Sequence, residues 1–340
     1  MAVHETCCPV CGGRTALVYQ GHPSYVFRST YDIYSCAQCL VSFVYPLFVE
    51  QKDYDAIYSD AEYIAGYDKY HALSQRILSA ERPLDVMADL GDEYAFVINR
   101  LQLLAKKGDP VLEVGCGLGY LTYALHAAGY DARGADLSAV SVRRATETYG
   151  SYYQCVGVND FSSLEGRRFR FIVLTEVIEH VMDPLSFLGS LKRLLADDGM
   201  ILLTTPNKSA FPSGALWMTD APPIHLWWFS EQSIVRLAAQ AGFRCGIFKG
   251  YVSDNPGYHY WNRADDISKP IFVPAFDKQG KLAKNADRFE FPDHGRSALK
   301  HLYVKYLPEF LKVLLTRLSN MVTETRKTVK HCTMFVELKS

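Results

Sequence analysis

Apolar residues in the middle of the chain fall into short, nearly continuous runs, and the stretches between them have the spacing of helices. The runs that predict strands are Pro110–Val114, Tyr130–Ala135, Tyr152–Val156, Phe169–Leu174, Gly199–Thr204, Arg244–Tyr251 and Cys332–Leu338. Runs of this kind are typical of strands covered on both faces, and the intervening helices allow parallel pairing. The pattern predicts an α/β fold whose seven-stranded sheet is mostly parallel, with one reversed edge strand.

Helical spacing precedes the first of these strands and follows most of them. The expected helices are Ala72–Ala80, Phe96–Lys107, Leu121–Ala128, 138–149, 183–195 and 230–241. Ser138 is placed to cap one of them, because a serine hydroxyl can accept from a free N–H in the first helical turn. Ser230 and Glu231 begin the last of this set, and Gly242 ends it.

Strand Pro110–Val114 leads into three glycines at alternate positions, Gly115, Gly117 and Gly119. Glycine permits backbone conformations that a Cβ atom blocks, and it lets a ligand lie directly against the main chain. The free N–H groups at the following helix start favour an anionic ligand group. A dinucleotide site has the spacing G-x-G-x-x-G, whose third glycine would fall on Tyr120. The spacing therefore favours a different ligand.

The Glu-x-Gly-x-Gly-x-Gly pattern that begins at Glu113 resembles motif I of the class I S-adenosylmethionine-dependent methyltransferases. The run Glu-Val-Ile-Glu-His-Val at 176–181 resembles the ubiquinone-pathway O-methyltransferase branch. The resemblance covers residues 96–241, and it implies a Rossmann-like methyltransferase fold with S-adenosylmethionine as cofactor. Enzymes that methylate amino groups of nucleic acid bases usually have an Asn/Asp-Pro-Pro-aromatic tetrad where this chain has residues 175–178, so base N-methylation is disfavoured.

Several residues are expected to contact this cofactor. Asp136, about 20 positions beyond the glycines, is placed to accept from both ribose hydroxyls. The resemblance implies that Asp160 binds the adenine amino group, that Phe161 packs on the ring, and that tyrosines of the 46–109 segment fold over the cofactor; packing aromatics are the alternative for those tyrosines. The full predicted set is Glu113, Gly115, Gly117, Gly119, Asp136, Leu137, Asp160, Phe161, Thr175, Tyr63 and Tyr67.

Two Cys-x-x-Cys pairs lie near the start of the chain, Cys8 with Cys11 and Cys36 with Cys39, and short strands are expected between them. Four thiolates from two tight turns can surround Zn²⁺ tetrahedrally, and the metal supplies folding free energy that so short a segment lacks. The pattern predicts a structural zinc ribbon; unligated thiols and a redox pair are the alternatives. Four cysteine ligands leave no open position for catalysis by this metal.

The aromatic segment 208–229 leaves the carboxyl end of a predicted strand, where open α/β sheets bind ligands. The residues expected to line the substrate pocket are Glu176, Trp217, Trp227 and Tyr258. Methyl transfer to a hydroxyl needs a base, and histidine suits that role near neutral pH. His225 and His180 are the candidates for the base, although either could be a packing histidine instead.

Five segments follow from these features. Residues 1–45 form the ribbon, 46–109 a tyrosine-rich linker with helices over the cofactor, 110–251 the cofactor-binding core, 252–330 an insertion and 331–340 the final edge strand. The second half of the insertion has amphipathic helical spacing. The insertion is expected either to cap the pocket or to form a homo-oligomer contact.

Composition narrows the choice of partner. With 340 residues, 49% of them hydrophobic, the chain can bury a large core. The 36 basic and 37 acidic residues give a net charge of −1, which disfavours a nucleic acid partner. The chain starts without a basic, apolar leader, and no apolar run reaches membrane-spanning length. A cytoplasmic location without a membrane partner is therefore expected, where cysteines serve as ligands or buried thiols.

The predicted reaction is O-methylation of a small polar metabolite, such as a sugar, a glycan end or a natural-product hydroxyl, because aromatic walls with few charges suit sugar stacking. C- or N-methylation of a sugar or secondary metabolite is an alternative, because the ribbon-first order also resembles deoxysugar C-methyltransferases. A zinc-ribbon protein that binds or modifies RNA is a third hypothesis, based on the ribbon and on the basic end of the helix expected at 299–329.

Overall fold

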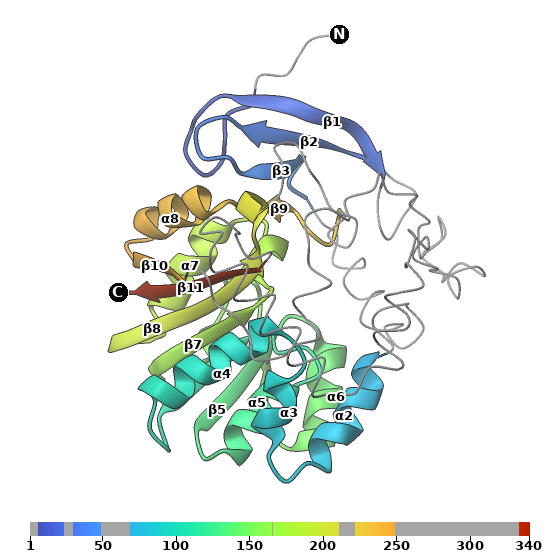
Figure 1. Ribbon diagram of the computed structural model, residues 1–340, viewed down its shortest axis with the longest axis vertical. Helices are drawn as coiled ribbons and strands as arrows, with labels where there is room; N and C mark the ends of the chain where they lie inside the picture. Colours follow the sequence, from blue (N-terminus) through green and yellow to red (C-terminus); the bar gives the residue numbers. More distant parts are fainter. Residues whose placement is uncertain (1–5, 24–29, 49–68, 165, 211–221, 249–332) are drawn as a thin grey trace, which may run out of the picture.

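The computed structural model describes residues 6–23, 30–48, 69–164, 166–210, 222–248 and 333–340 (Figure 1). These residues form a seven-stranded sheet with the strand order β10-β11-β8-β7-β4-β5-β6 and a four-stranded sheet with the order β1-β2-β3-β9. Four residues predicted for the site, Tyr63, Tyr67, Trp217 and Tyr258, lie outside the described residues, as does the 252–330 insertion.

The large sheet confirms the predicted α/β fold. Its strands are β4 (Pro110–Val114), β5 (Asp131–Asp136), β6 (Tyr153–Cys155), β7 (Phe169–Thr175), β8 (Leu195–Pro206), β10 (Arg244–Phe248) and β11 (Thr333–Lys339). Strands β6, β5, β4, β7 and β8 pair in parallel, and β11 is antiparallel to both β8 and β10.

The prediction of a final edge strand was wrong. Strand β11 is reversed as expected, but it lies between β8 and β10, so that β10 forms the edge. The burial of the two strands gives the reason: Met334 to Leu338 are all buried, whereas every residue of β10 is at least partly exposed. A continuously buried strand is stabilised when neighbours pair with both of its sides.

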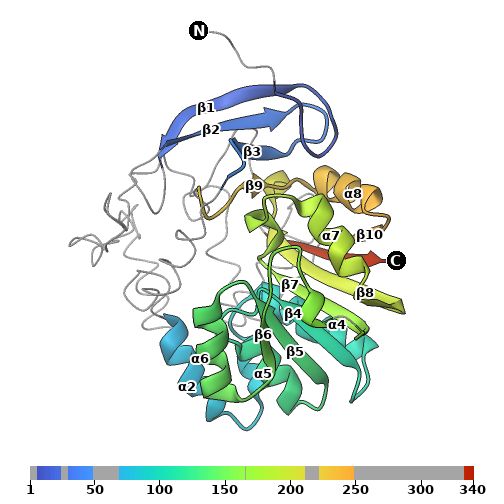
Figure 2. The same cartoon turned by 180° about the vertical axis from the view of Figure 1, so that it is seen from behind.

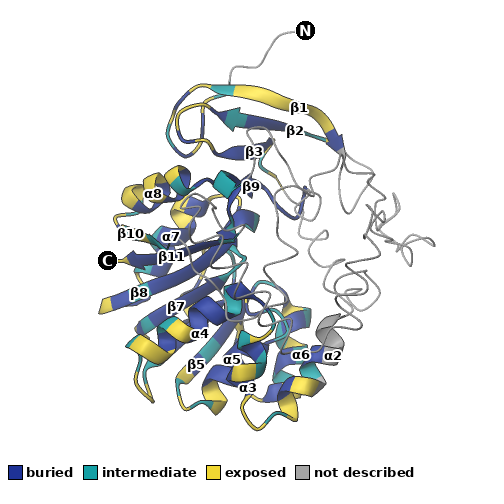
Figure 3. Cartoon of the chain, in the orientation of Figure 1, coloured by how far each residue is buried: buried dark blue, intermediate teal, exposed yellow. Residues whose placement is uncertain are grey.

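Helices cover both faces of the large sheet (Figures 1 and 2). One face packs against α7 (Pro184–Lys192) and α8 (Glu231–Gln240). The other packs against α2 (Lys69–Leu78), α3 (Pro83–Ala88), α4 (Asp92–Leu104), α5 (Tyr120–Ala127) and α6 (Ala139–Tyr149). Figure 3 shows the buried strands between helices whose outer faces are exposed. Among the described residues, no helix combines the length and apolar composition needed to cross a bilayer.

Local sequence signals explain where several helices begin. Ser138 accepts from the N–H of Ser141 at 3.2 Å, which confirms the predicted cap of α6. Ser230 and Ser233 form a reciprocal capping box at the start of α8.

Helix α3 was not predicted. Three short 3₁₀ turns follow strands or loops: η2 (Ser162–Leu164), η3 (Ile178–His180) and η4 (Lys208–Ala210).

The small sheet contains β1 (Thr15–Pro23), β2 (Thr30–Cys36), β3 (Ser42–Tyr45) and β9 (Trp227–Trp228). Its fourth strand comes from the aromatic segment that was predicted to be a pocket wall. Trp227 is only 2% exposed, its ring lies 5.7 Å from that of Phe43, and its Nε1 donates to the carbonyl of Val181 at 2.7 Å. Trp227 is therefore a core residue that joins the ribbon to the large domain.

Candidate functional site

The candidate site lies at the carboxyl ends of the central strands, where the strand order reverses. From β4 the sheet continues to β5 and β6 on one side, and β7 and β8 follow on the other. A reversal of this kind opens a ligand-binding crevice in α/β sheets. The loops after β4 and β7 meet there, because a Cβ added to Gly115 would lie 2.6 Å from Cγ2 of Val177.

The loop after β4 is the glycine turn, and φ is positive at Gly115 (76°), Gly117 (51°) and Gly119 (86°). The N–H of Gly115 donates to the carbonyl of Ala135 at 2.8 Å, which ties the turn to β5. A Cβ at Gly119 would lie 2.6 Å from the ring of Tyr153, whereas a Cβ at Gly117 would have no heavy atom of the described residues within 4 Å. Packing therefore requires Gly119, and Gly117 presents backbone that a ligand can approach.

Asp136 is the last residue of β5 and is 4% exposed. Its Oδ2 accepts from the N–H of Gly117 at 2.8 Å, and its Oδ1 accepts from the N–H of Ser138 at 2.8 Å. Burial raises the pKa of this carboxyl, while the N–H groups of Ser138 and Gly117 act in the opposite direction. The carboxylate is thus held rigidly beside the open backbone of the glycine turn.

Glu113 is buried at 4% exposure, and its Oε2 accepts from the hydroxyl of Thr122 in α5 at 2.5 Å. Burial raises the pKa of Glu113 from 4.5 to about 8; the hydrogen bond from Thr122 lowers the pKa, and the charge of Asp136 adds to the increase. Its predicted contact with the cofactor stays a prediction, because the partner described for its side chain is Thr122.

We expect Glu113→Gln to reduce the pH dependence of stability. The folded state keeps the Glu113 proton from about pH 4.5 to about pH 8, and the unfolded state releases it. The stability contributed by this group is therefore complete below pH 4.5 and falls by about 1.4 kcal/mol per pH unit up to the folded pKa. Urea unfolding at pH 6 and pH 9 measures the effect, with the exposed residue Glu147 as control through Glu147→Gln. Parallel curves for wild type and Glu113→Gln would contradict it.

The other predicted cofactor residues have different surroundings. Leu137 and Thr175 are half-buried at the ends of β5 and β7. Asp160 is exposed and accepts from the N–H of Ser162 at 3.0 Å. Phe161 is buried in the core, with its ring 6.3 Å from that of Phe187. Their contacts with a cofactor stay predictions.

Two histidines and a carboxyl lie close together at the η3 turn, which follows Val177. His180 and His225 pack edge to face, with ring centroids 4.5 Å apart. Glu179 is fully buried, its Oε2 accepts from the hydroxyl of Thr205 at 2.9 Å, and its Oε1 lies 3.9 Å from Nε2 of His180. One ligand atom from each of these three residues lies within 4.8 Å of the others, so the cluster could also hold a cation.

Burial keeps this cluster neutral. It raises the pKa of Glu179 to about 8 and lowers the pKa of His180 and, more strongly, of His225, where the charge of His180 adds to the decrease. Nδ1 of His180 lies 2.7 Å from the carbonyl of Ile224. A carbonyl can only accept, so this contact places the proton of the neutral ring on Nδ1; the backbone of Glu176 is a second hydrogen-bond partner of the ring.

The sequence prediction missed Glu179 as a site residue, although it stands beside His180 in the run Glu-Val-Ile-Glu-His-Val at 176–181. An ionisable side chain between Ile178 and a candidate base, His180, is the signal that could have identified it. Glu176, predicted for the substrate pocket, has a positive φ of 53°. That conformation is uncommon for a residue other than glycine and occurs preferentially at functional sites.

Comparison with known proteins identifies the family. Residues 88–245 match a family model described as a methyltransferase domain. The ubiquinone biosynthesis O-methyltransferases of Actinobacillus pleuropneumoniae serotypes 5b and 7 are 35% and 34% identical to this chain over 176 residues, and each alignment covers 46% of this chain and 75% of the relative. The chain belongs to the class I S-adenosylmethionine-dependent methyltransferases. A solved S-adenosylmethionine-dependent methyltransferase from Archaeoglobus fulgidus is 15% identical to this chain, with a TM-score of 0.43. The match covers 74% of this chain and 95% of that protein, and at this distance it carries no information about the site.

The glycine turn of this methyltransferase fits its methyl donor. The open backbone at Gly117 leaves room that a Cβ would fill, and the Asp136 carboxylate beside it can accept from ribose hydroxyls. These two residues would hold S-adenosylmethionine, a role that stays a prediction.

The four ribbon cysteines of the methyltransferase converge as the spacing predicts. Cys8 Sγ lies 3.6 Å from Cys39 Sγ, and Cys11 Sγ lies 3.5 Å from Cys36 Sγ. Both knuckles have the same backbone form: Gly12 N–H donates to Cys8 O at 2.8 Å and Leu40 N–H to Cys36 O at 3.0 Å, with positive φ at Gly12 and Leu40. Hydrogen bonding with Cys39 holds the pKa of Cys8 below its ordinary value. Four sulfurs so placed suit tetrahedral Zn²⁺.

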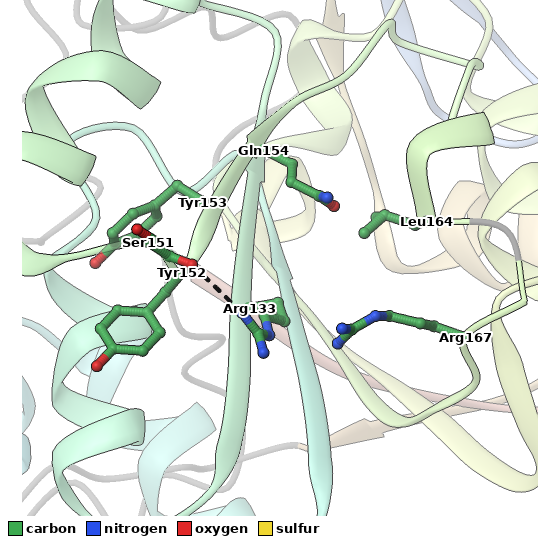
Figure 4. A pocket seen from close by; sticks show the side chains of 7 residues that line it. All are labelled: Arg133, Ser151, Tyr152, Tyr153, Gln154, Leu164 and Arg167. Carbon is green, nitrogen blue, oxygen red and sulfur yellow. Dashed lines mark hydrogen bonds between the residues drawn. The ribbon is translucent and has the colours of Figure 1, made fainter.

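A separate hollow lies beside the edge strand β6, where the side chains of Arg133 and Arg167 approach each other near Tyr152 and Gln154 (Figure 4). Arg133 Nη1 donates to the carbonyl of Ser151 at 3.4 Å. This hollow is lined by residues at the start of β6 and before β7, away from the carboxyl ends of the strands, so it is not part of the candidate site.

Proposed function

We propose that the enzyme transfers a methyl group from S-adenosylmethionine to a hydroxyl of a small polar molecule, such as a sugar, a glycan end or another natural product. The observation that carries this proposal is the position of the neutral histidine cluster next to the glycine turn. Val177, which lies against Gly115, joins the two, because the turn that carries His180 begins directly after it. The relatives that match the core are named as O-methyltransferases, which supports oxygen as the acceptor atom.

The bound cofactor supplies an electrophilic methyl group on a sulfonium sulfur. The residues of the chain then have two tasks. Gly117 and Asp136 hold the donor, and a histidine removes the proton of the acceptor hydroxyl. The carbonyl of Ile224 orients the His180 ring with Nε2 as the nitrogen that accepts the proton, and His180 is partly exposed, whereas His225 is buried. These features favour His180 as the base and His225 as the residue that packs against it.

A methyl-labelling experiment tests the acceptor. The purified enzyme would be incubated with S-adenosylmethionine carrying an isotopically labelled methyl group and with fractions of a cell extract. We expect label in a small, polar product, and the chemical shift of the methyl carbon in that product separates oxygen, nitrogen and carbon acceptors. Label on carbon or nitrogen would contradict the O-methylation proposal, and retention of label on RNA would contradict the small-molecule assignment.

A further inference from the structure

The ribbon sheet continues directly into the segment that carries His225. Strand β3 pairs with β9, with Phe43 opposite Trp227. The N–H of Val44 donates to the carbonyl of Leu226 at 3.0 Å, and the N–H of Leu226 donates to the carbonyl of Glu179 at 2.9 Å. The residue next to His225 therefore bridges the ribbon and the η3 turn, and Figure 1 shows β9 between β3 and the large domain.

A second attachment joins the ribbon to the end of β8. Lys208 follows β8 in η4 and is 8% exposed. Its ammonium donates to Ser35 Oγ at 3.1 Å, to Leu40 O at 3.1 Å and to Ser42 Oγ at 2.6 Å. Residues 35 and 40 immediately flank the second knuckle, so Lys208 contacts both ends of the turn that contributes two of the four sulfur ligands.

The hydrogen bonds described for the Lys208 ammonium go to neutral oxygens and not to carboxylates. All three acceptors are neutral, and no carboxylate of the described residues lies within ion-pair distance of Lys208. A buried charge is costly unless an opposite charge lies close by. Four thiolates around Zn²⁺ carry a net charge of −2, since metal ligation requires the thiolate form. Burial lowers the pKa of Lys208 to about 8, and the charges of Cys39 and Cys36 act in the opposite direction and favour the protonated side chain.

We propose that Lys208 is a positioning residue whose ammonium fastens the metal-loaded second knuckle to the end of β8 and, with the β3–β9 pairing, holds the histidine-bearing segment against η3. The ribbon is then a support for the site and not an independent module. The consequence for catalysis rests on the proposed function, whereas the attachment itself does not.

The test uses the full chain loaded with Co²⁺ or Zn²⁺. In Lys208→Met we expect a shift of the thiolate-to-cobalt charge-transfer band, loss of zinc to a chelator about tenfold faster, as for other outer partners of metal ligands, and reduced hydrogen-exchange protection of the Val44 and Leu226 amides. Lys106→Met, which removes an exposed lysine, should leave all three unchanged. Unchanged cobalt spectra or unchanged amide protection in Lys208→Met would overturn the proposal.

Lys208→Gln separates the charge from the hydrogen bonds, because an amide can still donate to the same oxygens. We expect it to behave like Lys208→Met in the cobalt spectrum and in zinc release. Wild-type behaviour of Lys208→Gln would show that the charge is not needed and would overturn the proposal. Since none of these measurements uses methyl transfer, failure of this proposal is distinct from failure of the proposed reaction.

Discussion

Asp136→Ala is expected to weaken S-adenosylmethionine binding by about 100-fold or more, because it removes two hydrogen bonds from the ribose to a charged group. Each such bond contributes roughly 1.5–3 kcal/mol, and about 1.4 kcal/mol changes Kd tenfold. The carboxylate is buried and already held by the N–H groups of Gly117 and Ser138. A ribose that binds there would therefore cost the carboxylate little further side-chain freedom. Calorimetric titration with the cofactor and with its demethylated product gives Kd directly.

The matched control is Asp160→Ala. Asp160 was also predicted to bind the cofactor, but it is exposed and bonds the N–H of Ser162. Its removal should change Kd much less than the removal of Asp136. Wild-type affinity in a folded Asp136→Ala protein, shown by an unchanged near-ultraviolet circular dichroism spectrum, would refute the cofactor assignment.

Gly117→Ala tests the same ligand site at the glycine turn, directly beside Asp136. The new methyl group would meet no heavy atom of the described residues within 4 Å, so the folded protein has space for it. The positive φ of 51° costs roughly 1–2 kcal/mol for a residue with a Cβ. This cost lowers the stability of the fold with and without ligand, and cofactor affinity should fall separately, because the methyl group occupies the space next to the Asp136 carboxylate.

Features specified by neighbouring residues could be predicted from the sequence. The glycine turn, the cap at Ser138 and the knuckle spacing each depend on contacts over a few positions, and the structure has them where they were expected. Strand β4 begins and ends at the predicted residues because its apolar run is bounded by an aspartate and a glycine.

Features specified by distant residues could not be predicted. The two-residue strand β9 exists only because β3 lies beside it, and its tryptophans gave no periodic signal. The position of β11 depends on which neighbour it pairs with, and periodicity does not contain that information. Lys208 looked like an ordinary loop lysine, since its acceptors are more than 160 positions away in the sequence, with separations of 173, 168 and 166.

The same limit applied to the choice between the histidines. The sequence placed His180 and His225 near the predicted strand ends and could not rank them by their partners. The structure distinguishes the two rings, because the carbonyl of Ile224 orients His180 and because His225 is the more deeply buried.

His180→Asn is accordingly expected to lower kcat by about 10²–10⁴-fold, the usual contribution of a positioned base, with little change in the Kd of the cofactor. His225→Asn should have a smaller effect, through the packing of the His180 ring. Burial lowers the pKa of both histidines from the ordinary value of 6.5, so the neutral, accepting form is present at neutral pH. The wild-type kcat should fall only on the acid side of pH 6.5, and His180→Asn should lose this acid limb.

The neighbours of the base provide the discriminating control. Glu179 faces His180 and is itself protonated below about pH 8, so Glu179→Gln keeps the neutral form and should retain most of kcat at pH 6.5. If instead Glu179→Gln and His180→Asn are equally inactive, and if turnover of the zinc-loaded wild type depends on an added divalent cation, the three side chains bind a cation and His180 is not the proton acceptor. An intact acid limb in His180→Asn with a lost one in His225→Asn would transfer the role to His225.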